Sequence, residues 1–215
     1  MTEDAVNQRE EELCELLCTA HLRLGRGQWN RMLERTPVGI FFLGFPMSFF
    51  GSTIVAFAAA FGLKRVIHTI FKLEEADAKS IGAEAPIRLT DTKYACPITG
   101  FMPIHCAVAN GQLQMYDFLT GANHHLAKKL DEIRIPCHLL ALVTQRTVHG
   151  LRERWSMLTP LQLAAKLGDK RMTRHILRKR LALNWKWGPL SSYRINLAEV
   201  DSVHAEGQVI LNGSP

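Results

Sequence analysis

The chain of 215 residues lacks the sequence motifs of the common enzyme classes. It contains no glycine-rich phosphate loop, no nucleophile elbow, no zinc-protease motif and no paired acidic constellation. His105 and Cys106 are neighbours, but adjacent residues of a helix project about 100° apart, which does not suit a nucleophile and its base. We expect His105 to bond neighbouring backbone instead. The sequence therefore predicts no enzyme, no catalytic residue, no metal and no cofactor.

Disulfide spacing and a signal peptide are also missing. The five cysteines are odd in number and match no disulfide framework, which favours a reducing compartment. The N-terminal sequence MTEDAVNQREEEL is acidic and lacks the basic start and apolar stretch of a signal peptide. We expect a cytoplasmic location, with the cytosolic face of a membrane as a further option. The cysteines are Cys14, Cys18, Cys96, Cys106 and Cys137.

The net charge of +6 and the pI of about 9.2 are those of a basic protein. Acidic lipid head groups, nucleotides and acidic peptides suit such a surface, and a solvated basic surface explains the same charge. We expect protein partners and no nucleic-acid partner.

Charged residues are absent from residues 36–63. Such a run is a candidate membrane span. Pro46 and several glycines interrupt it, however, and its second half aligns with two segments that are too polar to cross a bilayer. We therefore favour a packed helix over a span at 38–63.

These three aligned segments are the strongest pattern in the chain. Residues 51–62, 100–111 and 157–168 read GSTIVAFAAAFG, GFMPIHCAVANG and MLTPLQLAAKLG. A helical pattern follows each of them. A threonine cap, a first-turn proline and a terminal glycine are typical of a short helix with defined ends. The residues that define the pattern are Thr53, Ala58, Gly62, Pro103, His105, Ala107, Gly111, Thr159, Pro160, Ala164 and Gly168.

The pattern resembles the ankyrin repeat, whose first helix reads T-P-L-H-x-A. The resemblance implies an all-α ankyrin-repeat solenoid of helix-turn-helix units over residues 10–183. We expect a degenerate cap at 10–35 and repeats near 51–71, 100–119 and 157–181. The segments 72–98 and 120–156 are then a linker and an insertion that form long finger loops.

The N-terminal region divides into a disordered start at 1–9 and an amphipathic helix at 10–24. We expect Leu13, Leu16, Leu17 and Leu24 to form its apolar face. Cys14, Cys18 and His21 share another face, where a zinc site is possible but a half-buried packing role is favoured. The histidines of the insertion lack ligand spacing, and we expect them to be exposed: His124, His125, His138 and His149.

The C-terminal tail at 184–201 is rich in aromatic residues. Trp185 and Trp187 flank a lysine, Gly188 and Pro189 predict a turn, and Ser192 and Tyr193 lie in a strand-like run. The tail either caps the end of the last repeat or binds another subunit. Residues 202–215 are expected to be frayed.

Repeats and tail together resemble the vanilloid subfamily of transient receptor potential cation channels. Its last ankyrin repeat reads G-L-T-P-L-x-L-A-A-x-x-G, followed by W-x-x-G-P-[VL]-x-S-x-L-Y-x-L-x-E-I-D. This chain has LTPLQLAAKLG and WKWGPLSSYRINLAEVD. It departs from the pattern at Met157, Arg194 and Ile195, and it holds no six-helix pore segment.

The resemblance implies a cytosolic ankyrin module that mediates subunit assembly and regulation of a calcium-permeable channel, either as a truncated product or as a stand-alone relative. Trp185, Gly188, Pro189 and Ser192 would then lie in the assembly segment, with Trp187 and Tyr193 as neighbouring aromatics. A stand-alone ankyrin scaffold for protein partners is the alternative. The basic segment 170–180, from Lys170 to Arg180, suits calmodulin or acidic lipid, but an outer repeat helix with a charged face explains it too.

Overall fold

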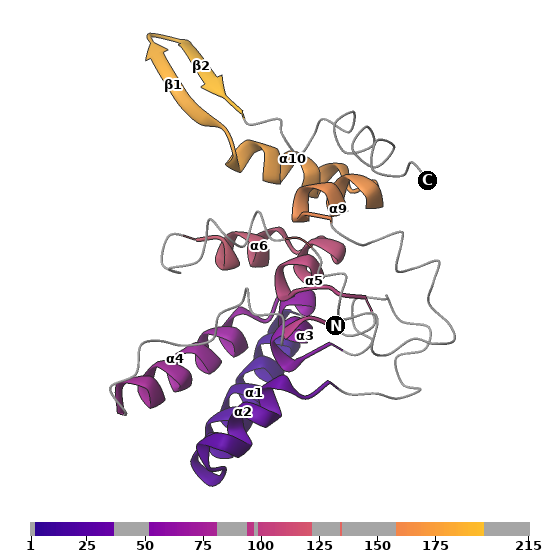
Figure 1. The fold of residues 1–215 in the computed structure, drawn as a ribbon. Helices are drawn as coiled ribbons and strands as arrows, with labels where there is room; N and C mark the ends of the chain where they lie inside the picture. The colour runs from indigo at the N-terminus through magenta and orange to yellow at the C-terminus, as the bar shows by residue number, and fades with distance from the viewer. Residues whose placement is uncertain are drawn as a thin grey trace, which may run out of the picture.

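The computed structural model describes residues 3–36, 52–80, 94–96, 99–121, 134 and 158–195. These residues form eight helices followed by one two-stranded antiparallel hairpin (Figure 1). The helices are α1 (Glu3–Arg23), α2 (Arg26–Glu34), α3 (Ile54–Phe61), α4 (Lys64–Ser80), α5 (Pro103–Ala109), α6 (Leu113–Leu119), α9 (Pro160–Leu167) and α10 (Lys170–Lys179); the strands are β1 (Ala182–Trp187) and β2 (Leu190–Arg194). The expected helical architecture with a β-like tail is therefore confirmed.

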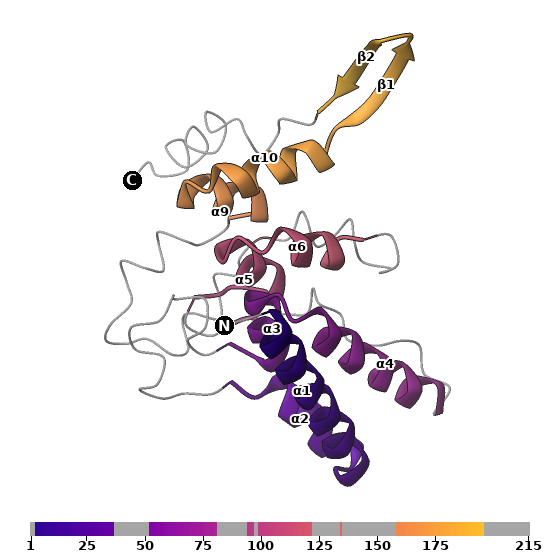
Figure 2. The same cartoon turned by 180° about the vertical axis from the view of Figure 1, so that it is seen from behind.

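Helix α5 lies between α3 and α9 and contacts both of them. Each of the three helices is followed directly by a partner helix that packs against it, so that α4, α6 and α10 extend to one side (Figures 1 and 2). The hairpin follows α10 and marks the opposite end of the molecule from α1 and α2.

The three central helices end in the same way. At the end of α3, Gly62 adopts a φ of +75°, and the next amide, that of Leu63, donates to the carbonyl of Ala58 over 2.9 Å. The same bond recurs after α5, from Gln112 to Ala107, and after α9, from Asp169 to Ala164. This is the Schellman ending, which needs a residue with positive φ and therefore favours glycine. The in-register alanines and glycines of the sequence thus set where these helices stop.

Side-chain caps define where the helices begin. The hydroxyl of Thr53 accepts a hydrogen bond from the amide of Ala56 at the start of α3, and Thr159 accepts one from Gln162 at the start of α9. Asp169 caps α10 by accepting bonds from two of its first amides. Each cap satisfies donors that have no partner inside the helix, which is worth about 1 kcal/mol.

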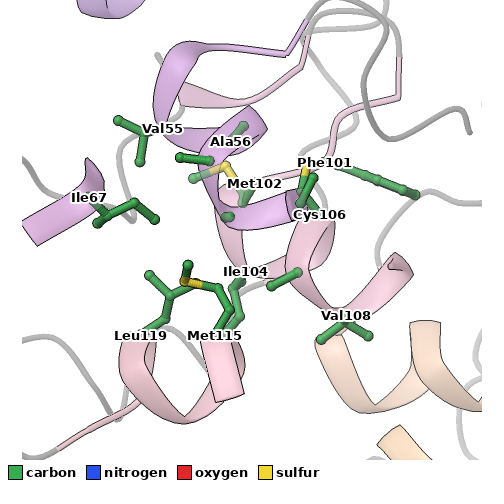
Figure 3. Packing of buried hydrophobic residues seen from close by; sticks show 14 of the residues in the cluster. Val55, Ala56, Ile67, Phe101, Met102, Ile104, Cys106, Val108, Met115 and Leu119 are labelled. Carbon is green, nitrogen blue, oxygen red and sulfur yellow. The ribbon is translucent and has the colours of Figure 1, made fainter. Parts of the chain in front are cut away.

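The hydrophobic core runs along the contacts between α3, α5 and their partner helices (Figure 3). The small side chain of Ala56 lies among the helix backbones, and larger ones such as Ile67, Met115 and Leu119 fill the space beside it. Ala107 is fully buried as well. Burying each of the larger side chains contributes about 1.5–3 kcal/mol.

The two N-terminal helices also pack on this core. The first of them, α1, packs against α4, the second helix of the next pair, whereas α2 contacts α3, the first helix of that pair. Polar bonds fix the arrangement. The carboxylate of the buried Glu10 accepts from the backbone amide of Arg65 at 2.7 Å, and the Trp29 indole donates to Glu74. The carboxylate of Glu10 therefore satisfies an amide in the first turn of α4, which no intrahelical carbonyl can reach.

Two expectations for α1 are wrong. The helix begins at Glu3, so residues 1–9 are not disordered throughout; acidic residues near an N-terminus are favoured by the helix dipole. Leu17 is buried as expected, but Leu13 and Leu16 face solvent, since the side of α1 that meets α4 carries Glu10 and Leu17.

Part of the expected linker at 72–98 is also helical. Helix α4 continues to Ser80 because residues 72–80 are mostly good helix formers, and a Lys79–Glu75 ion pair spans its last turn. Among the residues described, no helix has the length and apolarity needed to cross a bilayer. The first part of the uncharged run, 37–51, lies outside the described residues, and its last part forms the short helix α3. Apart from 120, 121 and 134, the insertion at 120–156 also lies outside them.

Candidate interaction site

The hairpin of β1 and β2 carries all six residues that the sequence marks for interaction. Gly188 has a φ of +56° and is followed by Pro189, a combination that fits a two-residue II′ turn with glycine first. Trp187 pairs with Leu190 next to this turn, and Trp185 pairs with Ser192. The predicted Gly-Pro turn and strand-like run are thus present, and the strands extend from 182 to 194.

The register gives the two faces of the hairpin different characters. Successive residues of a strand point to opposite faces, so Trp185, Trp187 and Leu190 share one face, which we call the aromatic face. Arg194 shares it near the base of the hairpin. The opposite face carries Leu183, Lys186 and Tyr193. A β-bulge at Asn184 lets Leu183 and Trp185 face opposite ways although they are two residues apart.

The aromatic face is open to solvent. Trp185, Trp187 and Leu190 are 51%, 79% and 59% exposed, and the hairpin projects away from α10 in both views (Figures 1 and 2). It therefore does not cap the last helix pair, one of the two roles left open for the tail. A lone two-stranded hairpin is marginally stable in water, and clustered exposed aromatics mark interaction surfaces. Leu190 belongs to this surface too, although the sequence analysis did not single it out.

The segment that contains α9, α10 and the hairpin is strongly basic. Residues 158–195 contain nine lysines and arginines and one acidic residue, Asp169, which caps α10. The exposed side of α10 carries Arg171, Arg174 and Arg178, whereas Met172 and Ile176 are fully buried. A calmodulin complex of the helix-in-groove type would need these two apolar side chains, which the core already holds. The arrangement agrees with a helix whose charged face is solvated.

A cluster of three charged or ionisable side chains joins α6 to α10. The carboxylate of Asp117 accepts hydrogen bonds from Nε2 of His175 at 2.6 Å and from Nζ of Lys179 at 2.7 Å. Partial burial raises the pKa of this carboxyl, but the bonds from Lys179 and His175, together with their charges, outweigh that effect and lower the pKa below 3.8. The cluster holds the C-terminal half of α10, from which the hairpin projects. No sequence signal pointed to it, because Asp117 lies 58 or more residues away from His175 and Lys179 along the chain.

His105 bridges two helix pairs through the backbone. Its Nδ1 accepts from the amide of Met102 at 3.3 Å, so Nε2 carries the proton and donates to the carbonyl of Leu158 at 3.1 Å. The side chain is fully buried. The expected structural role of this histidine is therefore confirmed, and the ring has no free nitrogen for catalysis.

The candidate metal residues of α1 are partly buried. Cys14 and Cys18 are half-buried free thiols, and His21 binds Asp77 over 3.0 Å and meets the ring of Trp29 edge-on. No group of three or more His, Cys, Asp or Glu side chains in the described ranges is placed to hold a metal. Cys106 is fully buried, which raises the pKa of its thiol and keeps it protonated. The four histidines of the insertion and Cys137 lie outside the described residues.

Comparison of the chain with protein-family models, with curated proteins and with solved structures gave no match. The residues and geometry of the chain itself therefore carry the functional proposal.

Proposed function

We propose that the chain is the ankyrin-repeat module of a transient receptor potential-like cation channel, located at the cytosolic face of a membrane. In this function the helix pairs form the scaffold and the hairpin joins neighbouring subunits. The resemblance of the repeats and of WKWGPLSSYRINLAEVD to that channel subfamily supports the proposal. Further support comes from His105, which ties one helix pair to the start of the next through the carbonyl of Leu158.

The observation that carries the proposal is the pair of exposed tryptophans on one face of a projecting hairpin. Tryptophan is enriched among residues that dominate binding energy, because its large side chain is rigid and loses little entropy when it is buried. Trp185 and Trp187 are positioned by strand pairing and keep 51% and 79% of their surface exposed. Such a surface lowers its free energy by docking on another protein surface.

The first experiment measures the mass of purified residues 1–215 by light scattering over a concentration series, without detergent. We expect concentration-dependent self-association that the double substitution Trp185→Ala/Trp187→Ala abolishes. The matched control is Leu183→Ala/Tyr193→Ala on the opposite face, which should leave association within about twofold of the wild type. Far-UV circular dichroism checks that all variants keep their helices.

A wild-type chain that stays monomeric up to about 1 mM would overturn the assembly function, because linked modules reach effective concentrations of about 1 mM and a contact that operates there should be visible. The alternative function is a stand-alone scaffold for a different protein. It is favoured if the wild-type chain is a monomer and the tryptophan variant is also a folded monomer.

A further inference from the structure

The outer face of α1 carries two leucines that the core does not use. Leu13 and Leu16 are 42% and 65% exposed, although they lie on the helix that packs against α4. They are one turn apart and therefore adjacent on the helix surface. Glu12 and Glu15 flank them and are exposed as well. We call these four residues the α1 patch.

The α1 patch is complementary to the hairpin in both apolar character and charge. The aromatic face offers two tryptophans and a leucine with Arg194 at its base, and the adjoining α10 carries Arg174 and Arg178 on its exposed side. Residues 1–22 contain six acidic residues and one arginine, whereas residues 158–195 have a large basic excess. Opposite potentials of this kind orient partners and suppress wrong pairings.

The two surfaces lie too far apart to meet within one molecule. Helices α1 and α2 form one end of the described part of the chain and the hairpin projects from the other end, as both views show (Figures 1 and 2). Contact between them therefore requires two copies.

We propose that the aromatic face of one copy docks on the α1 patch of a second copy, so that the chains associate head to tail. This inference rests on the proposed assembly function and adds to it the receiving surface. Trp185, Trp187 and Leu190 would cover Leu13 and Leu16, while Arg194 meets the carboxylates of Glu12 and Glu15. Because each copy keeps one free hairpin and one free α1 patch, the contact generates closed rings or open chains.

The charges predict a dependence on salt. Exposed ion pairs are screened when the Debye length falls from about 10 Å at 0.1 M salt to about 3 Å at 1 M. We therefore expect association to weaken about tenfold over that range and not to vanish, since the apolar contact remains. A purely apolar contact between two hairpins would not weaken in this way.

The decisive experiment uses one variant for each surface. Leu16→Asp places a charge in the α1 patch, and Trp185→Ala/Trp187→Ala removes the aromatic face. The matched control is Leu22→Asp, since Leu22 is an 85% exposed leucine on the same helix but is turned about 120° from Leu16. We expect the first two variants to be monomers and the control to associate like the wild type. Circular dichroism and thermal melting verify that each variant is folded.

Mixing the two monomeric variants separates head-to-tail contact from every symmetric alternative. The Leu16→Asp chain keeps its hairpin and the tryptophan variant keeps its α1 patch, so the mixture should form one-to-one heterodimers and no larger species. The inference fails, while the assembly function stands, if Leu16→Asp associates like the wild type and only the tryptophan variant is monomeric.

A wild-type chain that is monomeric at every concentration overturns both the inference and the assembly function. The remaining outcome is membrane binding, which is measured with vesicles of anionic and of neutral lipid. If such a monomer binds anionic vesicles through its tryptophans, the hairpin belongs to a membrane surface and not to a second copy.

Discussion

Replacement of His105 by alanine tests whether the backbone bridge between α5 and the segment before α9 holds the molecule together. The substitution leaves the amide of Met102 and the carbonyl of Leu158 without the ring nitrogens that bind them. A buried polar group without its partner costs about 1–3 kcal/mol. The cavity left by a fully buried ring adds to this loss, as large-to-small core substitutions cost about 2–5 kcal/mol. We expect a net loss of about 3–5 kcal/mol, since the site can partly collapse.

Urea unfolding followed by circular dichroism measures this loss. With a typical slope of about 2 kcal/mol per M, a loss of 3 kcal/mol lowers the midpoint by about 1.5 M. The control is His68→Ala, because His68 is exposed on α4 and its removal should change stability by less than about 0.5 kcal/mol. His105→Phe retains most of the volume but breaks both bonds, and should still cost about 2 kcal/mol or more. If the His105→Ala midpoint lies within about 0.3 M of the wild type, the bridging role is refuted.

Two further predictions concern the Asp117 contact between helix pairs and the glycine turns inside two of the pairs. Asp117→Asn should lower stability by about 0.2–1 kcal/mol at neutral pH, less at high salt, because the carboxylate is partly exposed. Since the pKa of Asp117 is lowered in the folded chain, the difference from the wild type should stay constant above about pH 5 and shrink as the pH falls below 3.8 and through the lowered value; a difference that grows on acidification would contradict it. Gly62→Ala and Gly168→Ala should each cost about 1–2 kcal/mol in thermal or urea unfolding, because both glycines have a φ of +75°. Gly62→Ala should cost more, since its new Cβ would lie 2.7 Å from Oε1 of Gln112 whereas no atom lies within 4 Å at Gly168; equal losses would show that Gln112 moves freely.

The sequence predicts those features of the fold that depend on neighbouring residues. Thr53 and Thr159 cap helices, and Gly62 and Gly168 end them, because the bonds involved join residues at most a few positions apart. The Gly188–Pro189 turn was predictable for the same reason. The role of His105 was accessible through its place in the repeat pattern.

Features that depend on distant residues could not be predicted in this way. Hydropathy placed Leu13 and Leu16 in the core, but the side of α1 that is buried depends on α4, whose Arg65 amide needs the carboxylate of Glu10. The Asp117–His175 contact joins residues 58 positions apart. The aromatic pattern located the candidate site, whereas its exposure depends on where α10 ends and how the strands pair.

The bulge at Asn184 affects the direction in which the hairpin points, but it does not change which side chains lie on the aromatic face. A bulge bends its strand and increases the local twist without changing the pairs beyond it. If Asn184 were deleted, the pairs from Trp185 to the turn would persist, and the tip would point elsewhere relative to α10. One inserted or deleted residue can therefore change the angle at which the hairpin leaves α10, while the side chains of its aromatic face stay the same.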